Sequence, residues 1–369
     1  SLANFTAASA DWQTDPFTIT ARQSENTTET LAAYGEVYFD LTENLEIMGG
    51  LRWFETDRSQ DSAIITPFAN QILIQFGSPA GMVGPEPNTP STESDTLFKS
   101  QITYRPTDDH QIYFQVAEGY RAGGVNATIV STIPPSYESD QTLNLELGAK
   151  TSWLDGRLFT NLSVYQVDWD NVQFEASYTQ QFNALVNCTE RSDGVRAKGF
   201  ELEIQAQATE NLDFGFNYTS IDAEWQVDSP DCLTAAGLAD TFEPPGQLNG
   251  DSLIGVPDYS GSAYLHYNFD SAPLGAESGF VRFDLMYQGK VKVNDDDLDE
   301  NLSNPSYVLA NANAVLDYGK FSVGVFIRNI ADEEAHLSLF QGLQSDNRVT
   351  PSNPRTIGAN FTYNFGDYD

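Results

Sequence analysis

The feature that most constrains the fold of this chain is a two-residue alternation of apolar and polar side chains, which returns in thirteen separate segments. In the last segment, Ile357, Phe361 and Phe365 share one parity, and Asn360 and Asn364 share the other. Successive side chains of a strand point to opposite faces. Each segment therefore predicts a strand with one apolar face and one polar face.

The connections between these strands alternate strictly between two lengths. Six are short turns, such as 41–44 and 209–211, and six are long, such as 58–93 and 227–256. An outer-membrane β-barrel has short turns on its periplasmic rim and long loops on its extracellular rim, whereas a soluble sandwich does not sort its loops by length. We therefore expect an all-β, antiparallel transmembrane β-barrel whose polar face surrounds a wet lumen and whose closure satisfies the backbone hydrogen bonds.

Two segments are less regular than the rest. Residues 1–27 lack a sustained period, which predicts an extracellular loop or the end of a preceding strand, with the first clear strand at about 31–40. In the strand over 157–170, two sets of apolar residues compete for the same face, because Leu162 and Val164 differ in parity from Phe159 and Tyr165. A bulge would explain this conflict, but the sequence does not decide it.

The charge balance excludes some classes of function. The chain has 53 acidic and 18 basic residues, a formal charge of −35, which argues against nucleic acid as a partner, because phosphates require Lys and Arg. We interpret the acidic surface as mainly solvated. The three histidines are dispersed, and His336 near three acids and the acidic run at 295–300 are interpreted as solvated loops. We therefore predict no catalytic, cofactor-binding or metal site.

Six stretches carry a resemblance to a known family. They are GLRWFE (50–55), EGYRAGGVN (118–126), LELGAKTSWLDGR (145–157), RAKGFELE (196–203), FIRNIAD (326–332) and PRTIG (354–358). In this order they resemble motifs of the C-terminal barrel of TonB-dependent outer-membrane receptors, in particular siderophore receptors. Two departures are that no aromatic residue follows 329–332 closely and that the chain continues past Phe365.

The resemblance implies a barrel of about 22 strands, together with a plug domain and an energy-coupling segment. No plug-like stretch is evident here, and thirteen is an odd number, whereas bacterial barrels have even strand numbers. We therefore expect residues 28–369 to be the C-terminal part of such a barrel, with the plug domain absent from this chain. The expected location is the outer membrane of a Gram-negative bacterium.

The implied function is TonB-dependent uptake of a scarce nutrient, most readily a ferric siderophore, although the acidic loops weigh against a strongly anionic complex. The implied partners are outer-membrane lipid and lipopolysaccharide, a small-molecule ligand, and the TonB complex through the absent N-terminal region. One alternative is a passive channel without a plug, such as a porin or a fatty-acid-type barrel, in which residues 1–27 supply a fourteenth strand. Another is a purely structural or adhesive barrel.

Charged and aromatic residues expected on the lumen side are candidates to face a ligand or the plug. The candidates are Arg52, Tyr120, Arg121, Glu146, Lys150, Lys198, Glu201, Glu203 and Arg328. Arg121 is the strongest, because it lies near the extracellular rim, beside Gly123 and Gly124. The simpler alternative is that these side chains pair with one another and hydrate the inner wall. Cys188 and Cys232 fall in long connections on the oxidising outer side, and we expect them to form a disulfide.

Overall fold

Thirteen strands form one continuous antiparallel sheet, as predicted, in a computed structural model of the chain. The structure describes residues 21–65, 84–85, 90–125, 136–178, 182–187, 194–227, 249–271, 273–293, 302–341 and 347–365. Consecutive strands of the sheet are hydrogen-bonded neighbours. They are β1 (Ala21–Thr42), β2 (Leu45–Ile65), β4 (Ser91–Thr107), β5 (His110–Arg121), β8 (Asp140–Trp153), β9 (Leu158–Asp170), β12 (Val195–Thr209), β13 (Leu212–Trp225), β14 (Tyr259–Phe269), β15 (Ser278–Gln288), β18 (Tyr307–Asp317), β19 (Phe321–Arg328) and β22 (Thr356–Tyr363).

Short strands occur within the long connections, where the sequence predicted only loop. β3 pairs with the end of β2 and is the fourteenth strand of the large sheet, and the others form four separate two-stranded hairpins. They are β3 (Gly84–Pro85), β6 (Gly124–Val125), β7 (Ser136–Tyr137), β10 (Gln173–Tyr178), β11 (Phe182–Asn187), β16 (Val291–Lys292), β17 (Ser303–Asn304), β20 (His336–Gln341) and β21 (Asn347–Pro351). A 3-10 turn, η1 (Pro273–Gly275), lies between β14 and β15.

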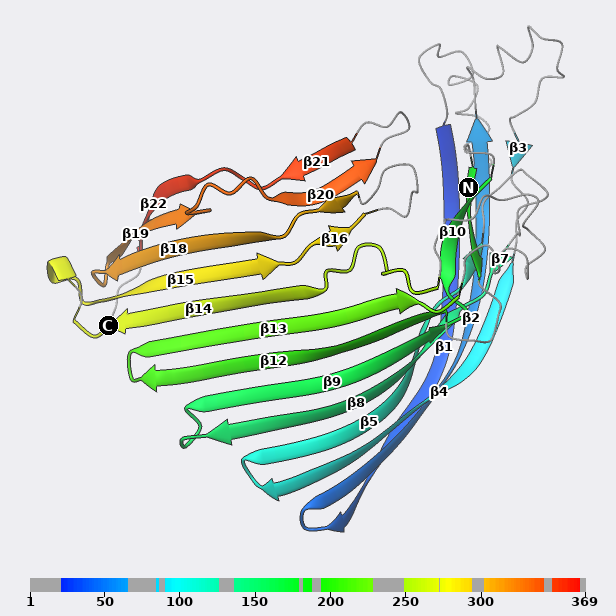
Figure 1. Cartoon of the computed structure of the whole chain (residues 1–369), viewed down its shortest axis with the longest axis horizontal. Helices are drawn as coiled ribbons and strands as arrows, with labels where there is room; N and C mark the ends of the chain where they lie inside the picture. Colours follow the sequence, from blue (N-terminus) through cyan, green and yellow to red (C-terminus); the bar gives the residue numbers. More distant parts are fainter. Residues whose placement is uncertain are drawn as a thin grey trace, which may run out of the picture.

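The large sheet is strongly curved, with β1 and β22 at the two ends of its strand order (Figure 1). The short turns lie along one side of the sheet, and the longer connections with their hairpins lie along the other, which we call the long-loop rim (Figure 1). The sorting of connections by length is therefore a property of the fold as well as of the sequence.

In the part of the chain that the structure describes, none of the helical segments has the length and hydropathy of a membrane-spanning helix.

The first two strands are longer than predicted. β1 begins at Ala21, so residues 21–27 belong to a strand and are neither a loop nor the end of an earlier strand. β2 continues to Ile65, so the predicted connection at 58–93 begins inside a strand. β1 and β2 pair over this whole length, from Ala21–Ile65 down to the turn. Most residues of these extensions are polar at both parities, which hides the alternation.

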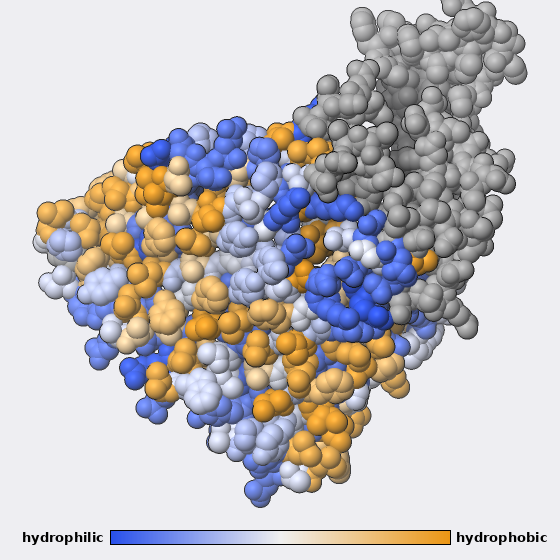
Figure 2. Space-filling model, in the orientation of Figure 1, coloured by the Kyte–Doolittle hydropathy of each residue, from blue (hydrophilic) through white to orange (hydrophobic). Residues whose placement is uncertain are grey.

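The two faces of the sheet differ as the alternation predicted. Large apolar side chains on one face are open to the surroundings: Ile102 is 46% exposed, Leu147 49% and Leu265 48%. Residues of the other parity on the same strands are mostly polar, such as Gln101, Glu146 and His266. Figure 2 shows hydrophobic and hydrophilic residues interspersed on the side of the molecule that is turned to the viewer. We call these surfaces the apolar face and the polar face.

β9 resolves the ambiguity over 157–170 without a bulge. Its ladders with β8 and β12 run without a register shift. Val164 lies opposite Leu147 on the apolar face, and Tyr165 lies opposite Glu146 on the polar face. Both parities are apolar or aromatic because the polar face itself accommodates large rings.

Those rings rest on glycines of the neighbouring strand. Four inward aromatic residues each stand directly opposite a glycine, and a Cβ atom built on that glycine would lie less than 3.0 Å from an atom of the aromatic side chain. Directly opposed residues share a face, so the missing side chain leaves the space in which the ring lies. The pairs are Tyr113–Gly148, Tyr165–Gly199, Tyr264–Gly215 and Phe326–Gly358.

Two of the six motifs join each other at the long-loop rim. Asn329, which is 5% exposed, donates from Nδ2 to the carbonyl oxygens of Glu333 (2.8 Å) and Asn353 (2.9 Å). Its Oδ1 accepts a hydrogen bond from the Glu333 backbone N–H at 2.8 Å. Oδ1 of Asp332 accepts one from the Arg355 backbone N–H at 2.7 Å. We call this arrangement the clasp, because it closes the connection that contains β20 and β21.

The clasp also carries a charge interaction. The guanidinium of Arg355 lies 3.4 Å from Oδ2 of Asp332. The backbone N–H of Arg355, more than its charge, lowers the pKa of Asp332 below its ordinary value of 3.8. Hydrogen bonds to the ionised form favour that form. The carboxylate therefore stabilises the clasp above the ordinary carboxyl pKa, and this contribution is lost as the pH falls through the lowered pKa.

The first prediction concerns the aromatic–glycine pairs. In Gly215→Ala, the new methyl group would meet the ring of Tyr264, which Arg282 covers from 4.2 Å. We expect a loss of about 1–3 kcal/mol of stability, the usual cost of overpacking, measured by thermal unfolding in detergent of the protein expressed from its complete gene. Gly49→Ala is the control, since nothing lies within 4 Å of its Cβ position. Equal effects of the two substitutions would contradict the packing argument.

The second prediction concerns the clasp. Asn329→Ala would remove three part-buried side-chain hydrogen bonds and place alanine at a φ of 52°, so we expect a loss of about 1–3 kcal/mol. Asp332→Asn should lower the unfolding temperature at neutral pH, and the difference from the wild type should shrink as the pH falls below 3.8. Unfolding temperatures measured across this pH range test both expectations. A difference for Asp332→Asn that does not depend on pH would contradict the charge contribution.

Candidate functional site

Most of the charged candidates lie on the polar face. Glu146 stands opposite Gln115 and Tyr165, and Glu203 stands opposite Asn161. The alternation of their strands places seven of the candidates on this face. They are Arg52, Arg121, Glu146, Lys150, Glu201, Glu203 and Arg328.

Lys198 is an exception, and its predicted inward placement is corrected by the register. β12 pairs with β9 and β13 without a shift between residues 195 and 206. Lys198 is three residues from Glu201, so it points to the opposite face and shares the parity of Phe200. Tyr120 and Arg121 are adjacent residues of β5, so these two side chains leave the strand on opposite sides. Arg121 shares the parity of Gln115 on the polar face, and Tyr120, which was also expected on the lumen side, has the other parity.

Three of the cations on the polar face cover the rings that rest on glycines. Nζ of Lys150 lies 5.7 Å from the ring centroid of Tyr113, and the guanidinium of Arg328 lies 5.1 Å from that of Phe326. Arg282 covers Tyr264 in the same way. Attraction between a cation and an aromatic face is worth about 0.5–1 kcal/mol at exposed sites. These cations therefore contribute to the order of the inner wall.

Arg121, the strongest candidate, is held by a buried carboxylate. Its Nε donates to Oδ2 of Asp140 at 2.9 Å, and a terminal guanidinium nitrogen donates to the same oxygen. The side chain of Asp140 is 1% exposed and that of Arg121 is 52% exposed. The guanidinium also lies over the ring of Trp169, 5.0 Å from its centroid. By register, all three residues share the polar face at the ends of β5, β8 and β9.

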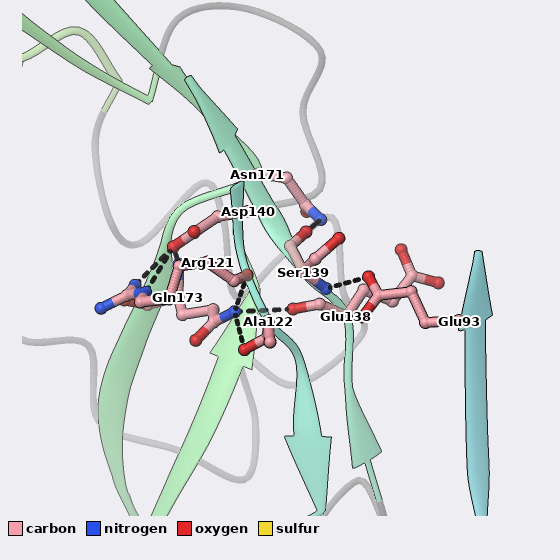
Figure 3. Close-up of polar contacts among 8 residues, drawn as sticks. All are labelled: Glu93, Arg121, Ala122, Glu138, Ser139, Asp140, Asn171 and Gln173. Carbon is pink, nitrogen blue, oxygen red and sulfur yellow. Dashed lines mark hydrogen bonds and ion pairs between the residues drawn. The ribbon is translucent and has the colours of Figure 1, made fainter. Parts of the chain in front are cut away.

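Gln173, the first residue of β10, completes the arrangement around Asp140. Its backbone N–H donates to Oδ2 of Asp140 at 3.4 Å. Its side-chain Nε2 donates to the carbonyl oxygens of Arg121 (3.3 Å), Ala122 (3.2 Å) and Glu138 (2.9 Å). Figure 3 shows these contacts converging between the strand ends. We call Arg121, Asp140, Trp169 and Gln173 the rim network.

The rim network is continued toward β4 by side chains that contact the backbone. Asn171 donates from Nδ2 to the carbonyl oxygen of Ser139 at 2.7 Å, and the Ser139 N–H donates to Oε1 of Glu93 at 3.1 Å (Figure 3). Arg58 of β2 in turn pairs with Glu93 at 3.2 Å. The ladder between β4 and β5 ends at Lys99–Ala117. Between that pair and the long-loop rim, side-chain contacts such as these connect β4 to the neighbouring segments.

A groove of about 780 Å³ lies beside this connection. Four acidic residues line it, and none of the lining residues is Lys or Arg. The lining residues are Ser91, Thr92, Glu93, Ser94, Asp95, Ser136, Tyr137, Glu138, Ser139, Gln141, Asp170 and Asn171. A ligand entering this groove would meet hydroxyl groups and carboxylates, which suits hydrogen-bond donors and positive charge better than an anion.

Tyr120 has a packing role that its sequence position did not reveal. Its ring stacks on that of Phe54, with centroids 4.0 Å apart and planes 15° apart, and Phe54 is fully buried. Gly124 of the same motif lies against Tyr137, the residue opposite it in the hairpin β6–β7. The motif at 118–126 thus shapes the rim.

Asp140, Trp169 and Gln173 were not predicted. Asp140 directly follows the long connection that the sequence placed at 123–139, and no rule fixes the register of strands joined by so long a segment. In the described part of the chain, no cluster of three His, Cys, Asp or Glu side chains could hold a metal ion. Cys188 and Cys232 lie outside the described residues, so the disulfide between them stays a prediction. The acidic run at 295–300 also lies outside the described residues.

Comparison with known proteins identifies the family. A family model described as "TonB dependent receptor-like, beta-barrel" matches residues 3–330. The pesticin receptor of Yersinia pestis is 31% identical over 130 residues, which cover 35% of this chain and 17% of that protein. The probable TonB-dependent siderophore receptor PiuA of Acinetobacter baumannii is 21% identical over 285 residues, 74% of this chain and 35% of that protein.

Solved structures show the same fold. The ferric yersiniabactin uptake receptor FyuA of Yersinia pestis superposes with a TM-score of 0.72 at 18% identity, over 93% of this chain and 46% of that chain. PiuA superposes with a TM-score of 0.68 at 17% identity, over 92% of this chain and 43% of that chain. The chain thus spans less than half the length of each of these relatives. The match across residues 3–330, together with the curved antiparallel sheet, means that this chain belongs to the TonB-dependent receptor family, through its β-barrel domain, and thus to a family of transport proteins of the Gram-negative outer membrane rather than of enzymes.

Proposed function

We propose that this chain forms part of the wall of an outer-membrane receptor that takes up a scarce nutrient with energy from the TonB complex. The observation that carries the proposal is the family match over residues 3–330. The two-faced sheet supports it, since exposed apolar side chains such as Leu147 and Leu265 suit contact with lipid. The long-loop rim would then be extracellular, beside lipopolysaccharide, and TonB would act through the N-terminal region of the receptor.

The proposed substrate is a ferric siderophore. Support comes from the relatives, which include receptors named for ferric yersiniabactin uptake and for siderophores. The charge of the long-loop rim restricts which ferric siderophores fit the proposal. The groove beside the rim network is lined by Glu93, Asp95, Glu138 and Asp170, and the whole chain carries a formal charge of −35. Like charges repel, so a neutral or cationic complex fits this rim better than a strongly anionic one.

Within the receptor, Arg121 is the proposed contact to the ligand. Half of its side chain is exposed on the polar face although the guanidinium is held by Asp140 and Trp169. Such a fixed cation loses little conformational entropy when it binds. It would recognise an oxygen-rich edge of the complex, such as a hydroxamate or carboxylate oxygen.

The third prediction tests the proposed function. Deletion of the complete gene should reduce uptake of radiolabelled iron from the matching ferric siderophore to background, and loss of TonB should have the same effect. Ferrioxamine B, a cationic complex, and ferric enterobactin, a strongly anionic one, are informative probes at low salt, where charge effects are least screened. We expect the deletion to affect ferrioxamine B more strongly.

Two results would contradict this proposal in different ways. Uptake that needs the gene but continues without TonB would indicate a passive channel. A deletion that affects only ferric enterobactin would retain the receptor and overturn the charge argument. The complete gene restored on a plasmid is the control for both.

A further inference from the structure

We infer that Asp140 is a positioning residue that couples two hairpins of the long-loop rim, β6–β7 and β10–β11, so that they hold one arrangement together. The starting point is the burial of its carboxylate, which is 1% exposed. Burying a charge is costly unless it is paired and hydrogen-bonded. Asp140 lies in the last residue pair of the β5–β8 ladder, opposite Arg121. The hydrogen bonds of the β5–β8 ladder join backbone groups and do not require a charged side chain at its last pair. We therefore assign the carboxylate to the segments that continue beyond the strand ends.

One carboxylate oxygen joins two segments that are far apart in sequence. Oδ2 of Asp140 accepts hydrogen bonds from the side chain of Arg121, the last residue of β5, and from the backbone of Gln173, the first residue of β10. Charge-assisted bonds of this kind are roughly twice as strong as neutral ones. The entry to β10 and the exit from β5 are thereby fixed to the same atom.

Gln173 extends the connection to both ends of the other hairpin. Its Nε2 contacts the carbonyl oxygen of Ala122, two residues before β6, and that of Glu138, directly after β7. The guanidinium of Arg121 also donates to the Gln173 carbonyl oxygen at 3.2 Å. β7 and β11 contact each other as well. A change in the orientation of one hairpin must therefore break contacts that hold the other.

The consequence for ligand capture rests on the proposed function. A ligand that contacts one hairpin would bias the position of the second through Asp140, without contacting it. Such coupling between two elements is a free energy that they share. The coupling itself is a property of the rim network and does not require that the ligand be known.

Hydrogen exchange of backbone amides, followed by mass spectrometry, tests the coupling in the ligand-free protein expressed from its complete gene and held in detergent micelles. Asp140→Asn keeps the shape of the side chain but removes its charge and presents an N–H group to donors. We expect exchange to become at least about tenfold faster in peptides covering β6–β7 and β10–β11 together. Exchange in the β8–β9 ladder below the rim should stay unchanged.

Two further variants keep the test decisive. Gln173→Met removes the three contacts to carbonyl oxygens without touching a charge or the large sheet, and it should reproduce the same joint acceleration if Asp140→Asn does not fold. Asp168→Asn is the matched control, because Asp168 of β9 forms a partly buried ion pair with Arg196 of β12, the next pair of strands in the sheet after β5 and β8. It should leave both hairpins at the wild-type rate.

The inference is overturned if Gln173→Met accelerates exchange in β10–β11 alone, or if Asp168→Asn accelerates both hairpins as much as Asp140→Asn does. The exchange measurement uses no siderophore and no TonB. A failure of iron uptake would therefore count against the proposed function and leave the coupling standing, whereas unchanged exchange would count against the coupling alone.

Discussion

The structure depends on one constraint, which is that the strands of the large sheet keep a constant register with their neighbours, apart from shifts beside three short turns, while their side chains alternate between two environments. A slip of one residue would exchange the two faces along the whole strand. β9 shows the strength of this constraint, since Phe159 and Tyr165 remain on the polar face although their rings are apolar. For Tyr165 the sheet provides space by placing Gly199 opposite the ring, so that the register is preserved.

The pairing of aromatic residues with glycines also determines the role of several charged residues on the polar face. An aromatic ring that lies against a glycine has a second surface turned away from it, and Lys150, Arg282 and Arg328 each lie over one of these rings. A charge on this wall therefore has a structural role before any ligand is considered. Arg121 differs from these three, because its carboxylate partner is buried while half of its own side chain is exposed. That asymmetry is the reason that we propose Arg121 as a contact to the ligand.

The strands could be predicted because period-two alternation is a local signal, repeated along each of them. What the sequence could not supply was the pairing of residues across long connections. The opposition of Arg121 and Asp140 requires the register between β5 and β8, which the segment between them does not determine. The placement of Lys198 was wrong for a simpler reason, since a spacing of three from Glu201 inverts the face. The polar ends of β1 and β2 were missed because an extension with two polar parities carries no alternation.

The two organised points of the long-loop rim solve one problem by different chemistry. A long connection must begin and end at fixed strand ends, and the backbone groups near those ends need partners once they leave the ladder. In the clasp, neutral Asn329 supplies both donors and an acceptor, and it needs no countercharge. In the rim network, buried Asp140 supplies only acceptors, so it needs a cation and draws Arg121 and Gln173 toward it. Neutral Asn329 closes a single connection, whereas charged Asp140 gathers the ends of several strands and so ties their hairpins to one another.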